Sequence, residues 1–205
     1  MLLRRLAFLA CALLAATPVL AQGAPGPTVR GVVAAVDGPM LTVTTRAGAS
    51  VKVKLAEATT VTGLARITLA DMPPDAYVGV AAVPQAGAPA GAPERAVSIH
   101  VFPAAQRGAG EGTRPYDVAP NASMTNGALS QKLVAKDGQL LTIAFKGGEK
   151  QVLVTSDTSL VSFEPGTRAE LTPGAQVLLR TTLGADGGAE ASRVLVGRNG
   201  VVPAL

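Results

Sequence analysis

The chain has few of the residues with which proteins build active sites. Aromatic residues make up 3% of its 205 residues, tryptophan is absent, and there is one histidine and one cysteine, Cys11. A disulfide needs two cysteines, and a metal site of histidine or cysteine ligands needs several such side chains together. The sequence therefore predicts no metal centre and no disulfide, and it indicates no cofactor.

Residues 1–21 have the pattern of a cleaved export signal. Arg4 and Arg5 precede an apolar run, and Ala21 ends a small-residue cleavage pattern. The run is shorter than the roughly 20 residues that span a bilayer, so we expect no transmembrane span in the mature chain, which also loses Cys11. The general and twin-arginine export routes both stay open. We expect a periplasmic or secreted protein of a Gram-negative bacterium.

The charge balance argues against a nucleic-acid partner. Cleavage after Ala21 removes two arginines and no acid, so the formal charge falls from +4 to +2. Residues 28–102 carry six basic and five acidic side chains, and residues 123–203 carry eight and seven. No segment concentrates positive charge as a nucleic-acid surface does. We expect the chain to bind no nucleic acid.

An internal duplication organises the rest of the sequence. Residues 37–43 (DGPMLTV) reappear as residues 137–143 (DGQLLTI), and residues 70–78 align with 169–177 at an offset of 99. Asp-Gly between apolar runs favours a tight hairpin, and the alternation in residues 51–55 (VKVKL) is typical of a half-buried strand. Each copy reads as five short strands with one helical turn between the third and fourth, the element order of a small OB-like barrel.

The sequence thus predicts an all-β protein of two tandem five-stranded OB-like barrels, each with one short helical turn. We expect the following segments: a signal peptide (1–21), a flexible tail (22–27), a first repeat (28–102), a Gly/Pro linker (103–122) and a second repeat (123–203). In the first repeat the helical turn is expected at residues 69–74, where two prolines stop it. A pair of open five-stranded sheets packed on each other is the alternative.

Several of these motifs resemble a known family. The pattern Gly31-x-Val33-x-x-Val36-Asp37-Gly38, followed by Leu41-Thr42-Val43, Leu69-Ala70-Asp71, a proline turn and Val78, resembles the bacterial DUF5666 domain. Both halves are similar to it, and exported bacterial proteins with two such units share a connecting Gly-Glu-Gly-x-Arg-Pro stretch. The resemblance implies an OB-like fold and export, and it brings no established activity.

The linker and the residues directly after it, up to Gly127, hold the candidate binding residues, because the duplication does not explain this stretch. It combines an aromatic side chain, an arginine and two acids, which a small ligand could use. Its glycines resemble a phosphate loop, but Pro115 prevents a following helix and no lysine is in register. The structural alternative is that these side chains attach the linker to both repeats. The candidate ligand-binding residues are Glu111, Arg114, Tyr116, Asp117 and Asn126.

No catalytic constellation emerges from the remaining residues. The alternation around His100 predicts that this side chain lies on the exposed face of its strand, and no serine stands in a nucleophile elbow. We therefore expect an exported non-catalytic binding or scaffold module with an envelope protein or a small ligand as partner. An OB-type binder of an oligosaccharide or other small ligand at the interdomain crevice is the alternative. A hydrolase is the third hypothesis.

Overall fold

The protein is built from strands. The computed structural model describes residues 24–136, 138–184 and 186–204. The strands of this part of the chain are β1 (Val29–Asp37), β2 (Met40–Thr45), β3 (Ser50–Arg66), β4 (Tyr77–Val83), β5 (Glu94–Val101), β6 (Gly112–Pro115), β7 (Ser123–Ala135), β8 (Gly138–Phe145), β9 (Gly148–Val154), β10 (Ser159–Pro165), β11 (Gln176–Leu183) and β12 (Ala189–Gly197). Two 3₁₀ turns, η1 (Ala104–Gln106) and η2 (Arg168–Glu170), complete the described elements.

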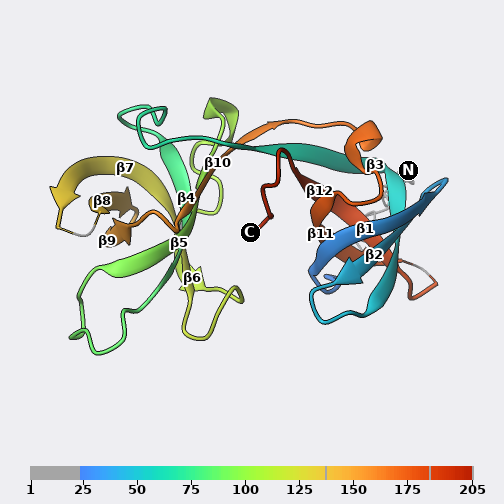
Figure 1. Cartoon of the computed structure of the whole chain (residues 1–205), viewed down its shortest axis with the longest axis horizontal. Helices are drawn as coiled ribbons and strands as arrows, with labels where there is room; N and C mark the ends of the chain where they lie inside the picture. The colour runs from blue at the N-terminus through green and yellow to red at the C-terminus, as the bar shows by residue number, and fades with distance from the viewer. Residues whose placement is uncertain (1–23, 137, 185, 205) are drawn as a thin grey trace, which may run out of the picture.

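Five of the strands close a barrel. β1 pairs with β2 and β11, β3 pairs with β2 and β12, and β11 pairs with β12, so every strand of this set has two neighbours. We call it the β1 barrel; it lies on the right of Figure 1. Closure leaves no free strand edge, which explains how such short strands remain protected. The closed circuit differs from the open sheets considered as an alternative.

A second circuit of pairings lies on the other side of the molecule. β4 pairs with β5 and β7, β8 pairs with β7 and β9, and β5 meets β9 in parallel over two residue pairs. We call this set the β7 ring, on the left of Figure 1. β10 connects the two sets, because it pairs antiparallel with β3 and parallel with β5.

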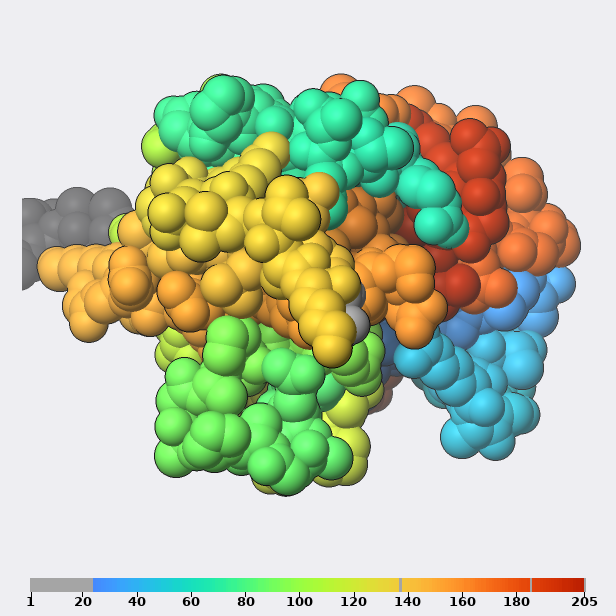
Figure 2. Space-filling model, turned by 60° about the vertical axis from the view of Figure 1, so that its left-hand side comes forward, coloured from blue at the N-terminus to red at the C-terminus, as the bar shows by residue number. Residues whose placement is uncertain are grey.

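Each set combines strands from both halves of the sequence, which differs from the expected tandem arrangement. The β1 barrel contains β1–β3 of the first repeat with β11 and β12 of the second, while the β7 ring contains β4 and β5 with β7–β9. β3 continues to Arg66, far beyond the strand expected at residues 51–55, and carries the chain across the molecule (Figure 1). In Figure 2, teal residues at and beyond the end of β3 lie beside orange and red residues of the second half. The two copies have equivalent strands, so the pattern of one copy does not specify its partner.

Corresponding strands of the two sets pair in the same register. In the β1 barrel Thr60 pairs in parallel with Arg193, and at the corresponding place across the molecule Ser159 pairs in parallel with Ser98. The hairpin β1–β2 shifts register between Val33 and Ala35, and β7–β8 shifts between Leu129 and Gln131. The molecule therefore has an approximate internal two-fold arrangement of strands.

Two glycines hold equivalent places in these hairpins. An added Cβ on Gly31 would lie far inside contact distance of the Thr44 carbonyl oxygen, and one on Gly127 would meet the Ala144 carbonyl oxygen in the same way. Only glycine permits so close an approach of two backbones.

Each set has its own small core, and a third cluster lies between them. The β1 barrel is filled by side chains such as Val33, Leu41 and Leu179, and the β7 ring by Val80, Ile99 and Leu141. The cluster between the sets consists of Leu64, Val161, Leu178, Leu195 and Val201. These apolar contacts join the two sets into one molecule.

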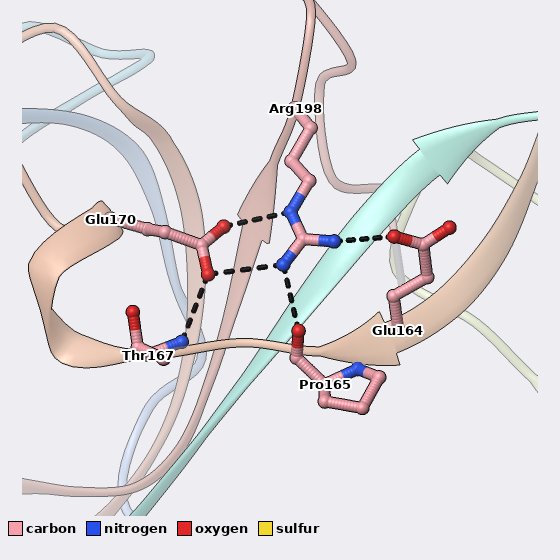
Figure 3. Close-up of polar contacts among 5 residues, drawn as sticks. All are labelled: Glu164, Pro165, Thr167, Glu170 and Arg198. Carbon is pink, nitrogen blue, oxygen red and sulfur yellow. Dashed lines mark hydrogen bonds and ion pairs between the residues drawn. The ribbon is translucent and has the colours of Figure 1, made fainter.

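Arg198 ties together the segments that cross between the sets. Its guanidinium donates through Nε and Nη2 to both carboxylate oxygens of Glu170, at 2.8 and 3.0 Å, and through Nη2 to the Pro165 carbonyl at 2.7 Å (Figure 3). It also pairs with Glu164. Glu170 in turn accepts a hydrogen bond from the Thr167 backbone N–H, which completes a capping box at η2.

Two expectations about local structure were wrong. His100 is 1% exposed, because the face of β5 expected to meet solvent is covered and its ring lies 5.6 Å from that of Phe163 on β10. Residues 69–72 form bends and residue 74 begins a turn, so no helical turn is present there, although the Asp71 carboxylate still accepts from the Thr68 N–H at 2.8 Å. The corresponding turn of the second half is present as η2.

Some expectations concern other parts of the chain. The predicted signal with Cys11, and Asp137 of the second hairpin, lie outside the described residues. Among the residues described, no helix has the length and apolar character needed to cross a membrane.

Candidate functional site

A pocket of about 370 Å³ lies between the β1 barrel and the β7 ring. This volume is in the range of pockets that hold small molecules. Its walls come from both sets of strands and from the segment between β5 and β7. The lining residues are Phe102, Gln106, Ala109, Gly110, Arg114, Tyr116, Met124, Asn126, Phe163, Arg180, Arg193 and Leu195.

One wall of the pocket is aromatic. The rings of Phe102 and Phe163 lie with their centroids 5.1 Å apart, and Tyr77 packs behind Phe102 at 5.6 Å. Phe102 follows β5 and Phe163 belongs to β10, so strands of different halves bring the two rings together. Such a wall offers an apolar surface against which a ring can pack.

Another part of the lining is basic. Arg114 lies on β6, Arg180 on β11 and Arg193 on β12. All three side chains are exposed, and none takes part in an ion pair with the residues that the structure describes. Arg114 donates to the Gly110 carbonyl at 3.0 Å and Arg180 to the Thr28 hydroxyl at 2.9 Å. No acidic residue is among the lining residues.

Three of the five residues predicted to bind a ligand line this pocket. They are Arg114, Tyr116 and Asn126. The Asn126 amide donates to the Ala109 carbonyl at 3.0 Å, and Tyr77 donates its hydroxyl to the same carbonyl at 3.2 Å. These bonds hold the 109–114 segment against β7, with which β6 pairs.

The two predicted acids have other partners. Asp117 accepts from Arg30 of β1 through both carboxylate oxygens, at 2.8 and 3.0 Å. Glu111 accepts from the backbone N–H of Lys146 at 2.9 Å. Neither lines the pocket. They attach the linker to both sets of strands.

Tyr116 connects the linker to the chain end. Its hydroxyl accepts from Arg30 at 3.1 Å and donates to the Ala204 carbonyl at 2.9 Å. Burial raises the pKa of the Tyr116 phenol, so the group stays neutral and can donate. The hydrogen bond from Arg30 lowers the pKa of Asp117, and the charge of Arg180 adds a smaller effect in the same direction. Asp117 is therefore ionised at neutral pH.

The sequence interpretation missed the pocket residues outside the linker that lie on strands or directly after one, chiefly Phe102, Phe163, Arg180 and Arg193. It missed them because it placed Phe102 in one barrel and the other three in another. A comparison of the copies holds a signal: Arg180 and Arg193 pair across β11 and β12, where the corresponding pair on β4 and β5 is Ala81 and Ser98. Charged residues in one copy and small ones in the other indicate a local role.

The described residues contain no cluster of three or more histidine, cysteine, aspartate or glutamate side chains that could hold a metal ion. Burial lowers the pKa of His100 to about 3, so its imidazole is neutral at physiological pH. Its Nδ1 has no hydrogen-bond partner among the described residues. What the pocket presents is a basic and aromatic surface.

Comparison with known proteins adds no relative: no family model matches the chain, and neither a curated protein nor a solved structure matches it.

Proposed function

We propose that this chain is an exported, non-catalytic binding module of the bacterial periplasm or cell envelope. In this proposal the pocket between the β1 barrel and the β7 ring holds a small ligand. We further propose that the two sets of strands are OB-like units of the DUF5666 family that have exchanged strands. The motifs around Gly31 and Leu69 and the duplicated registers support the family assignment.

The observation that carries the binding proposal is the composition of the pocket. Three arginines that form no ion pair with the described residues, and two phenylalanines in contact with each other, line one cavity. Arginine forms bidentate hydrogen bonds with carboxylate and phosphate groups, and aromatic rings pack against apolar or ring-shaped bodies. Such side chains recognise and hold a molecule. They do not form the nucleophile and general base that hydrolysis needs.

A binding screen with a blocked pocket tests the proposal. The secreted or periplasmic protein, with Gln22 as its expected first residue, is screened by ligand-observed NMR against sugars, sugar acids, nucleotides and aromatic acids. Gln106 is half-buried in the pocket wall, so we expect Gln106→Trp to fill the cavity and abolish binding. Gln131→Trp, on an exposed position of β7 outside the pocket, should bind as the wild type does.

Binding that both variants retain would place the ligand elsewhere and contradict the proposal. A screen in which no compound binds would contradict it as well. The first residue of the recovered protein, measured by mass spectrometry, tests export separately.

A further inference from the structure

Two arginines face each other across neighbouring strands in the pocket. Arg180 of β11 and Arg193 of β12 are direct register partners. Like charges placed directly opposite destabilise a sheet, because their repulsion is not offset by a contact. Both side chains nevertheless line the same cavity, and Arg114 adds a third positive charge from β6. Folding alone therefore does not explain this pair.

The other set of strands shows that the fold does not need these charges. Ala81 and Ser98 pair at the corresponding place on β4 and β5, and they are 0% and 1% exposed. A small, uncharged pair thus satisfies the same register in the β7 ring. The arginines occur only where the pair lines the pocket.

Among the residues that the structure describes, no acid forms an ion pair with Arg180 or Arg193. Asp117 is the acid whose pKa Arg180 helps to lower, but both of its oxygens accept hydrogen bonds from Arg30. Glu111 is engaged with the backbone of Lys146. Neither acid forms an ion pair with Arg180 or Arg193, so both guanidinium groups can pair with an anion from solution.

The apolar part of the pocket lining indicates which chemical group the ligand has besides its anionic group. Phe102 and Phe163, both partly exposed, provide an apolar surface in the same cavity as the arginines. A bare inorganic ion would leave this surface uncovered, whereas a molecule with a ring would bury it and gain the hydrophobic contribution.

We propose that the ligand is a small organic anion with a ring-shaped body. Its carboxylate or phosphate group binds Arg180 and Arg193, with Arg114 as a third contact, and its ring packs against Phe102 and Phe163. This inference rests on the proposed function, because it names the chemical class of ligand for the same pocket.

Three matched probes test it: 1-naphthoate, 1-naphthyl phosphate and the neutral 1-naphthalenemethanol, titrated calorimetrically at about 20 mM salt, where screening is weak. We expect at least one anion to bind about tenfold more tightly than the alcohol, because a charge-assisted bidentate contact is worth a factor of that size. The anion that binds identifies carboxylate or phosphate as the preferred group.

Arginine variants sharpen the test. Arg180→Gln and Arg193→Gln should each weaken anion binding about tenfold and leave binding of the alcohol unchanged. Arg95→Gln removes an exposed arginine of β5 that does not line the pocket, and it should change neither. Thermal unfolding without ligand provides a second readout. The pocket variants should melt at or above the wild-type temperature, since repulsion is relieved.

The outcomes separate this inference from the proposed function. One outcome would overturn only the anion assignment: neutral compounds bind as tightly as the anions, Gln106→Trp abolishes binding, and both arginine variants bind normally. The binding pocket itself would then stand. Arginine variants that melt below the wild type and bind anions normally would overturn the anion assignment too, by assigning the pair a structural role. Absence of any binding, or binding that Gln106→Trp does not alter, would overturn both.

Discussion

The β1 barrel and the β7 ring follow one plan and differ in how they close. In the β1 barrel, uninterrupted β3 pairs with β12 over seven residue pairs. In the β7 ring the corresponding stretch is divided into β9 and β10, so β5 meets β9 over two pairs and β10 over four. Buried threonines hold the same place in both: Thr59 donates to the Ala191 carbonyl at 2.6 Å, and Thr158 to the Ala96 carbonyl at 2.9 Å.

A comparison of the β1 barrel with the β7 ring distinguishes residues needed for the shared fold from residues with a role in only one set. Residues that match between the two sets, such as Thr59 and Thr158, serve the shared fold. Some corresponding residues differ between the two sets, such as Arg180 of β11 and Ala81 of β4. The shared fold does not fix such positions, so they can serve ligand binding.

Alanine at either hairpin glycine should destabilise the protein strongly and to a similar extent. An added Cβ on Gly31 would lie 2.9 Å from the Thr45 Cα, and one on Gly127 would lie 2.9 Å from the Ile143 Cγ2, besides the carbonyl oxygens closer still. Neighbouring backbone must move, so we expect Gly31→Ala and Gly127→Ala each to lower the free energy of unfolding by about 3 kcal/mol. Urea denaturation measures both.

Gly148→Ala is the matched control for these variants. Its added Cβ would meet only the Phe145 ring, at 3.9 Å or more, so we expect stability to stay within about 0.5 kcal/mol of the wild type. A large loss for Gly31→Ala with none for Gly127→Ala would show that the two hairpins are not equivalent.

The sequence was a good guide to strands and a poor guide to their partners. The Asp-Gly hairpin at residue 37 and the alternation in residues 51–55 correctly placed β1, β2 and the start of β3. The exchange between halves could not be predicted, because duplicated strands have duplicated edges and either copy can pair with the other. Periodicity places a side chain on one face of a strand but does not show whether another strand covers that face, which is why His100 was expected in solvent.

The candidate site was predictable only in the linker and the residues directly after it. Arg114, Tyr116 and Asn126 stand out as residues that the duplication does not explain. Arg180 and Arg193 look like ordinary exposed strand residues in the sequence, and only the register of β11 and β12 brings them together. Phe163 lies in β10, which no expected strand covered.

Because His100 is buried, it should make the protein sensitive to acid. The corresponding residue of the β1 barrel is Leu195, which cannot titrate. Burial lowers the folded pKa of His100 to about 3, against about 6.5 in the unfolded chain. The unfolded state therefore binds the extra proton first, and stability is lost as the pH falls from 6.5 towards 3. One such group lowers the free energy of unfolding by about 2 to 3 kcal/mol between pH 6.5 and 4.5.

His100→Leu, which copies the other set of strands, should remove this part of the acid sensitivity. Denaturation midpoints measured from pH 7.5 to 4.5 test it, with Ser98→Ala, a buried neighbour on the same strand, as the control that keeps the histidine. Curves for wild type and His100→Leu that run parallel over this range would show that His100 is not held neutral.

Arg198 should stabilise the segment between β10 and β11, where it contacts Glu164, Pro165 and Glu170. Asp71 corresponds to Glu170 and lies in the segment between β3 and β4. Among the described residues, its carboxylate bonds only to the backbone N–H and hydroxyl of Thr68. Arg198 is partly exposed, so screening reduces its contribution, and we expect Arg198→Gln to lower the free energy of unfolding by about 1 to 2 kcal/mol. Urea denaturation of the single variants and the double variant with Glu170→Gln measures the coupling.

The double variant decides whether the contact acts as drawn in Figure 3. If Arg198 acts mainly through Glu170, removing both partners should cost clearly less than the two single losses added together. Strictly additive losses would mean that Arg198 contributes through Glu164 and the Pro165 carbonyl instead. In both cases the pocket should keep its affinity for a ligand, since Arg198 does not line it. A loss of ligand binding in Arg198→Gln would show that the segment between β10 and β11 also sets the distance between the β1 barrel and the β7 ring.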